Sequence, residues 1–249
     1  MSLRGLLNFI SGDLERKTLL CVLVPLIFMA YFGTLAFACF WFPGTYDWRY
    51  RVISSLISPW NNPEFHWIPS AGITGTGLLM IPFVGYINRR VRVGCRLAAN
   101  IGTFAFGSGV VWLILAALVV SQRHHGSSSM LARLHEICAR TSALGLATGM
   151  LLFCSCAIKG YFVPITGNKA INVQLLVSWI LLTLPPILVA LGWCLLLATY
   201  ARFTWSMAVY HALKNSVAWH LAFWEWVGSA AVFLFLLSSA LFLPEHANT

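Results

Sequence analysis

Hydrophobic residues gather along the chain in six long, nearly uninterrupted runs, and the segments between them hold most of the charged residues. About 20 apolar residues, at 1.5 Å each in a helix, are enough to cross the ~30 Å hydrocarbon layer of a membrane. The pattern predicts an all-α, polytopic integral membrane protein, a six-transmembrane-helix bundle that forms a single domain. The expected spans are residues 18–41, 67–87, 97–120, 138–158, 171–200 and 226–243.

Composition supports this fold class and narrows the function. Hydrophobic residues make up 59% of the chain and charged residues 9%, whereas a soluble domain carries about 25% charged residues. This excludes a water-soluble enzyme and a nucleic-acid-binding protein of the basic-patch kind, so membrane lipids are the expected partners. The seven cysteines form no CxxC pair, which argues against a disulfide framework and a zinc knuckle.

Basic residues give the expected orientation. The N-terminal segment and the short connections 88–96 and 159–170 hold nine of the 16 Lys and Arg residues, and the three longer connections hold seven. Because the density of basic residues is highest in cytoplasmic loops, both termini are predicted to be cytoplasmic. The membrane is expected to be a bacterial inner membrane or an equivalent one.

Small residues and prolines inside the runs predict how the helices pack. Gly102, Gly107 and Gly109 in the third span and the Gly145/Gly149 pair in the fourth let backbones approach closely, as membrane helices need. Pro185-Pro186 in the fifth span predicts a kink, because each proline removes a backbone donor.

With this orientation, groups that can transfer protons or bind metals concentrate at the non-cytoplasmic face. Glu136 and Arg140 are four residues apart and are expected to pair on one helix face. Residues 210–221 predict an amphipathic surface helix or the start of a long sixth helix. The polar groups expected at this face are His66, His124, His125, His135, His211, His220, Asp47, Glu64, Glu136 and Glu225.

The first connection on this face is the richest in such groups. Arginines among tryptophans and tyrosines suit the lipid headgroup layer, where Arg can meet phosphate through two hydrogen bonds. An aromatic belt with arginines reaching to the interface accounts for Trp48, Trp60 and Trp67 without any further function. A ligand or headgroup site is the other interpretation, and its candidate residues are Asp47, Arg49, Arg51, Ser54, Asn62 and His66.

Three short motifs in this region carry a family resemblance. The stretch from Ile53 to Leu56 (Ile-Ser-Ser-Leu), the Asn62-Pro63 pair and the stretch from Gly72 to Gly75 (Gly-Ile-Thr-Gly) resemble a bacterial family of six-span membrane proteins of unknown function. More distantly they resemble the Frag/DRAM/Sfk membrane family. The resemblance covers residues 43–83 and implies a six-helix bundle linked to lipid handling or membrane organisation.

Several functions remain open at this point. The first is an integral membrane protein that binds or organises lipid or a lipid-like ligand at its outer face. The second is a membrane-embedded metal-dependent hydrolase, with zinc as the possible cofactor and His135, His211 and His220 as ligands. Haem is disfavoured, because most of the histidines fall in loops at one face. A further alternative is an accessory subunit that packs against other membrane-protein subunits.

Overall fold

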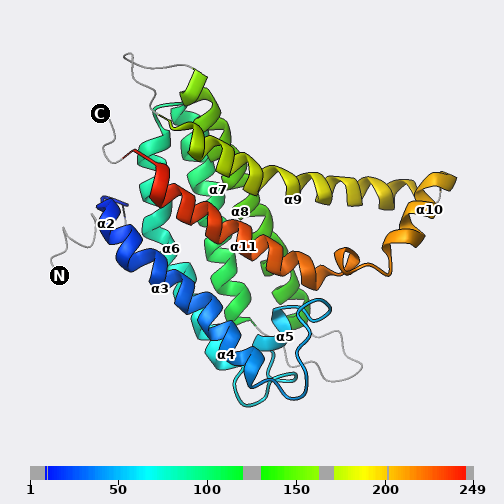
Figure 1. Cartoon of the computed structure of the whole chain (residues 1–249). Coiled ribbons are helices and arrows are strands. Elements are labelled where there is room, and N and C mark those ends of the chain that lie inside the picture. The colour runs from blue at the N-terminus through cyan, green and yellow to red at the C-terminus, as the bar shows by residue number, and fades with distance from the viewer. Residues whose placement is uncertain (1–8, 10, 120–129, 163–170, 201, 245–249) are drawn as a thin grey trace.

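The computed structural model describes residues 9, 11–119, 130–162, 171–200 and 202–244. The first long helix comprises five consecutive segments, α2, η1, α3, η2 and α4, and the later helices are separate (Figure 1). The bounds are α2 Arg16–Thr18, η1 Leu19–Leu23, α3 Val24–Phe28, η2 Met29–Gly33, α4 Thr34–Phe40, α5 Ser54–Ile57, α6 Trp67–Val91, α7 Arg96–Leu118, α8 Met130–Phe162, α9 Val173–Thr199, α10 Thr204–Leu213, η3 Val217–Trp219 and α11 Leu221–Phe242.

The fold is an all-α bundle, as predicted. Within the described ranges there is no strand, and six helices are long and apolar enough to cross a membrane. Each covers most of its predicted span, and the largest difference is that α8 begins at Met130, eight residues before the expected start; α11 begins five residues early, at Leu221, and α6 ends four residues late, at Val91. The first turns of α8 carry Arg133, His135 and Glu136, and the predicted ion pair between Glu136 and Arg140 forms on its surface. An ion pair between residues four apart stabilises a helix, so this pair stabilises the part of α8 that precedes the predicted apolar span.

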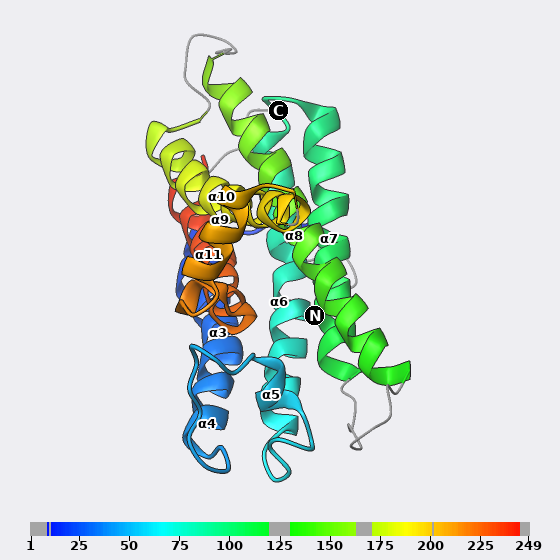
Figure 2. The ribbon, with the colours of Figure 1, turned by 90° about the vertical axis from the view of Figure 1, so that its right-hand side faces the viewer.

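Helices α6, α7 and α8 stand side by side as a layer, and the first long helix, α9 and α11 lie on one side of it (Figure 2). The glycine seam predicted between the third and fourth spans is present, except that Gly107 is not part of it, because nothing lies within 4 Å of its Cβ position. A Cβ atom on Gly109 would lie 2.6 Å from the backbone nitrogen of Leu146, and one on Gly145 would lie 2.8 Å from the Cα atom of Gly109. Gly149 faces the backbone of Phe106 in the same way. Without side chains at these positions, the two backbones touch.

The first long helix alternates between α-helical and π-helical turns. Its buried side chains recur at almost every fourth position, at Leu19, Leu23, Ile27, Tyr31, Leu35 and Ala38. In a regular α-helix a four-residue spacing drifts by roughly 40° per step around the axis. The π turns η1 and η2, with their i→i+5 bonds, wind more slowly and offset this drift. The stripe therefore stays on the inner face along the whole helix.

Helix α9 starts against α8 and then leaves the bundle, and α10 and α11 complete a hairpin that returns to it (Figure 1). Four of the five buried side chains of α9 precede Pro185, and only Leu196 follows it. Helix α9 continues through Pro185-Pro186. The prediction of one amphipathic helix over residues 210–221 is wrong: residues 210–213 are the end of α10 (Thr204–Leu213), residues 217–219 form η3, and α11 begins at Leu221.

Two sets of contacts define the ends of the bundle. At one end, the guanidinium group of Arg16 donates to the carbonyl oxygen of Leu243, and that of Arg90 donates to the carbonyl oxygen of Pro244. These bonds join the start of the first long helix and the end of α6 to the end of α11. At the other end, Ser70 donates to the carbonyl of Ala117. The loop of residues 43–66 lies at this second end. Residues 122–129, which include His124 and His125, lie outside the described residues.

The glycine seam gives the first testable prediction. Gly109→Ala places a Cβ against the backbone of α8, and overpacking of this kind typically destabilises a protein by about 1–3 kcal/mol. Gly107→Ala is the matched control, because nothing lies within 4 Å of its Cβ position. Thermal unfolding of the purified protein in detergent should show a lower midpoint for Gly109→Ala alone. Equal midpoints for the two variants would contradict the seam.

Candidate functional site

The 43–66 loop is ordered by its own polar groups. The Tyr46 hydroxyl donates to the carbonyl oxygens of Arg51 (2.9 Å) and Val52 (3.3 Å), and burial raises the pKa of this phenol. The Asp47 carboxylate accepts hydrogen bonds from the Arg49 backbone and from its guanidinium, at 2.9–3.1 Å. The side-chain hydrogen bond holds the pKa of Asp47 below its ordinary value. Two of the predicted ligand-binding residues thus satisfy each other.

Arg51 has a different environment. Its guanidinium lies over the ring of Phe42, 5.0 Å from the ring centroid, a cation–π contact. Among the residues that the structure describes, no Asp or Glu lies within ion-pair distance of it. Arg51 is therefore the loop cation whose charge is not neutralised by a carboxylate of the described chain.

The other predicted loop residues do not meet at one point. Ser54 starts the short helix α5. Asn62 is fully buried, and its side-chain nitrogen donates to the Leu56 carbonyl at 3.0 Å, so it ties α5 to the segment before α6. A ring nitrogen of His66 lies 3.2 Å from the Pro63 carbonyl at the start of α6. Asn62 and His66 therefore have structural contacts within the loop.

A residue that was not predicted for the site, Glu225, anchors this loop to α11. One of its carboxylate oxygens accepts a hydrogen bond from the Ile53 backbone N–H at 2.6 Å. No ion pair to Glu225 forms within the described ranges. Close by, the hydroxyls of Tyr31 and Ser229 lie 2.7 Å apart and join the first long helix to α11. An acidic side chain within an apolar span marks a candidate functional position.

The sequence does contain a signal for Glu225. It is the only acidic residue between Glu136 and Glu245. Its partner, however, is a backbone group 172 positions away, and no local spacing shows such a contact.

The three histidines predicted as metal ligands lie on different elements. A ring nitrogen of His135 on α8 lies 2.9 Å from the Ala116 carbonyl of α7. His211 is on α10, beside the rings of Tyr200 and Tyr210. His220 precedes α11 and packs edge-on against Tyr50. The described part of the chain holds no group of three or more His, Cys, Asp or Glu that could bind a metal ion, so the structure does not bring these ligands together.

An apolar cavity of about 460 Å³ lies in the hairpin, between α9, α10 and the start of α11. We call it the hairpin pocket. The Ser216 hydroxyl donates to the Leu213 carbonyl and the Trp224 indole N–H donates to the Ala218 carbonyl, each at 2.7 Å, so both are satisfied within the chain. The pocket is lined by Val189, Gly192, Trp193, Leu195, Leu196, Trp205, Val209, Leu213, Ser216, Ala218, Trp219, Phe223 and Trp224.

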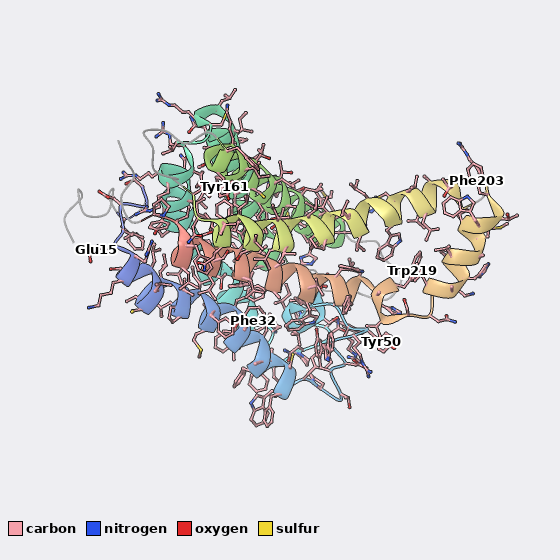
Figure 3. All side chains as sticks on the ribbon, turned by 45° about the horizontal axis from the view of Figure 1, so that its top comes forward. Glu15, Phe32, Tyr50, Tyr161, Phe203 and Trp219 are labelled. Atoms are coloured by element: carbon pink, nitrogen blue, oxygen red, sulfur yellow. The ribbon has the colours of Figure 1, made fainter. Side chains whose placement is uncertain are left out.

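The hairpin pocket and the 43–66 loop are neighbours. Phe223, which lines the pocket, packs against Trp48 of the loop with ring centroids 6.3 Å apart. Next to this contact, the Tyr50 and His220 rings meet at 4.7 Å. Figure 3 shows Tyr50 on the loop near the part of the hairpin that carries Trp219. An apolar cavity therefore adjoins a loop that carries arginines.

Comparison with known proteins adds no relative. No protein-family model, no curated protein and no solved structure matches the chain.

The Glu225 contact gives the second prediction. Glu225→Ala removes the acceptor for the Ile53 N–H, and loss of such a bond typically destabilises by about 1–3 kcal/mol. Hydrogen exchange of the backbone amides of residues 50–57, followed by mass spectrometry, should become faster by roughly tenfold or more. In Glu225→Gln, which keeps an acceptor oxygen, these backbone amides should exchange as slowly as in the unmodified protein.

Glu64→Ala is the control for this experiment, because Glu64 is an exposed acid on the same loop. It should leave the exchange unchanged. Equal exchange in Glu225→Ala and the unmodified protein would show that Glu225 does not anchor the loop.

Proposed function

We propose that the protein is an integral membrane protein that binds a lipid or lipid-like ligand at one face of the membrane. The ligand's apolar chain would occupy the hairpin pocket, and its polar end would lie beside the 43–66 loop. The observation that carries this proposal is the position of Phe223, whose side chain lines the pocket and also contacts Trp48 of the loop.

The chemistry of the lining supports an amphiphilic ligand. Four tryptophans line the pocket, and tryptophan is common at the membrane interface because it combines an apolar body with one polar N–H. Ligand sites are mostly apolar, with a few polar groups that fix orientation. Here the cavity provides the apolar part, and the polar groups belong to the adjoining loop. The resemblance of residues 43–83 to families linked with lipid handling is consistent with this assignment.

The orientation predicted from the basic residues belongs to the same proposal. The 43–66 loop would face the non-cytoplasmic side, and both termini would be cytoplasmic. In support of this arrangement, Arg16 at the start of the first long helix contacts Leu243 at the end of α11, so these two described positions lie at the same end of the bundle.

Gly192 allows a direct test of binding. It lines the pocket, and nothing lies within 4 Å of its Cβ position. Gly192→Leu should fill part of the cavity without disturbing the fold. We expect it to weaken binding by about tenfold or more, equivalent to 1.4 kcal/mol. Gly107→Leu, also with open space around the Cβ position but outside the pocket, should bind normally.

The probe is a fatty alcohol with a dibrominated chain, titrated into nanodiscs of unbrominated phosphatidylcholine that contain the protein. Bromine quenches tryptophan fluorescence on contact. The pocket-specific signal is the part of the quenching that the unmodified protein shows and Gly192→Leu does not. Equal quenching curves for Gly192→Leu and Gly107→Leu would refute binding in the pocket.

A labelling experiment tests the orientation. Asn61→Cys, at an exposed position of the loop, should react in intact cells with a membrane-impermeant maleimide, above the level of the unmodified protein. Val93→Cys, on the connection at the opposite end of the bundle, should react only after the cells are opened. The reverse pattern would place the loop in the cytoplasm.

A further inference from the structure

The hairpin is positively charged and contains no acidic residue before Glu225. Between Glu136 and Glu225 the sequence has no Asp or Glu at all, whereas Arg202 and Lys214 lie within the hairpin. The first acidic residue that follows in the hairpin is Glu225, and its carboxylate is engaged with the backbone N–H of Ile53. In a low-dielectric setting the field of basic residues discriminates strongly between ligand charges.

Lys214 is adjacent in sequence to residues that line the hairpin pocket. It directly follows Leu213 and stands two residues before Ser216, and both of these line the cavity. Its backbone N–H donates to the Tyr210 carbonyl and closes α10, and its side chain is exposed. The backbone of Lys214 is thus held next to lining residues, and its exposed side chain is not part of the apolar lining.

The 43–66 loop, which contacts the hairpin through Tyr50, carries a second cation. Tyr50 contacts His220, which directly follows the pocket residue Trp219. Arg51 is the next residue, with its guanidinium over Phe42 and no carboxylate partner in the described part of the chain. Arg49, by contrast, is neutralised by Asp47. Arg51 is therefore a loop cation without a carboxylate partner in the described chain, and it directly follows a residue that contacts the hairpin.

We propose that the ligand of the hairpin pocket is an anionic amphiphile, whose phosphate or carboxylate head lies at the rim near Lys214 and Arg51. This inference rests on the proposed function and specifies the chemical class of the ligand. No charged side chain lines the cavity, so the chain of the amphiphile enters it and the head remains outside. Arginine and lysine both bind phosphate and carboxylate oxygens.

Four probes with the same dibrominated chain test the inference. They carry an alcohol, a carboxylate, a phosphate monoester or a primary amine as the head group, and each is titrated into the nanodiscs described above. The carboxylate and the phosphate should bind more tightly than the alcohol by about fivefold or more, since one basic residue near a surface contributes about that much. The amine should bind most weakly, and added salt should reduce the differences.

Variants that remove one positive charge test which residues cause the tighter binding of the anionic probes. Lys214→Gln and Arg51→Gln should each reduce the preference for the anionic probes several-fold while leaving binding of the alcohol unchanged. A purely structural role of Lys214 at the end of α10 would weaken all four probes equally and would overturn its assignment. Arg96→Gln removes the same charge at an exposed position at the other end of the bundle, and it should have no effect.

The outcomes separate this inference from the proposed function. Equal affinity for the alcohol and the anionic probes would overturn the anionic ligand and leave the pocket in place. Absence of pocket-specific quenching with every probe would overturn the proposed function itself. If an anion is preferred, tighter binding of the phosphate supports a phospholipid-like ligand, and tighter binding of the carboxylate supports a fatty acid.

Discussion

The close contact between α7 and α8 is the constraint on which the rest of the structure depends. Lipid tails are as apolar as the helix surfaces, so membrane helices associate mainly through packing rather than through a hydrophobic driving force. Gly109 and Gly145 bring the two backbones into contact. The resulting layer of α6, α7 and α8 is the surface against which the first long helix, the start of α9 and the end of α11 pack (Figure 2).

The candidate site is built on this layer by contacts between distant parts of the chain. Glu225 accepts a hydrogen bond from the backbone of Ile53 and so fixes the 43–66 loop to α11, and the Tyr31–Ser229 contact close by fixes the first long helix to α11. The ring contact between Trp48 and Phe223 then sets the loop beside the hairpin pocket. The position of the pocket relative to the loop arises from α11, which takes part in both.

The sequence was informative where the governing interaction is local. Apolar runs located all six spans, the glycines located the α7–α8 seam, and a four-residue spacing located the pair of Glu136 and Arg140. The contact between Glu225 and Ile53 was not predicted, nor was the hairpin pocket, because both depend on residues that meet only after the helices have packed. Asn62 was predicted to bind a ligand, and this stays a prediction; its side-chain nitrogen donates to the Leu56 carbonyl, and an amide gives the same sequence signal in either role.

The two π turns of the first long helix place a limit on how this segment can change. One stripe of side chains serves both the main core, through Leu19 and Ile27, and the cluster beneath the 43–66 loop, through Tyr31 and Leu35. Deleting or inserting one residue between these pairs would rotate the outer half by about 100°. Tyr31 would then face lipid. The number of residues in this helix is therefore coupled to its number of π turns. An insertion or deletion is tolerated only if a π turn is gained or lost at the same time, so that the buried stripe stays on one face.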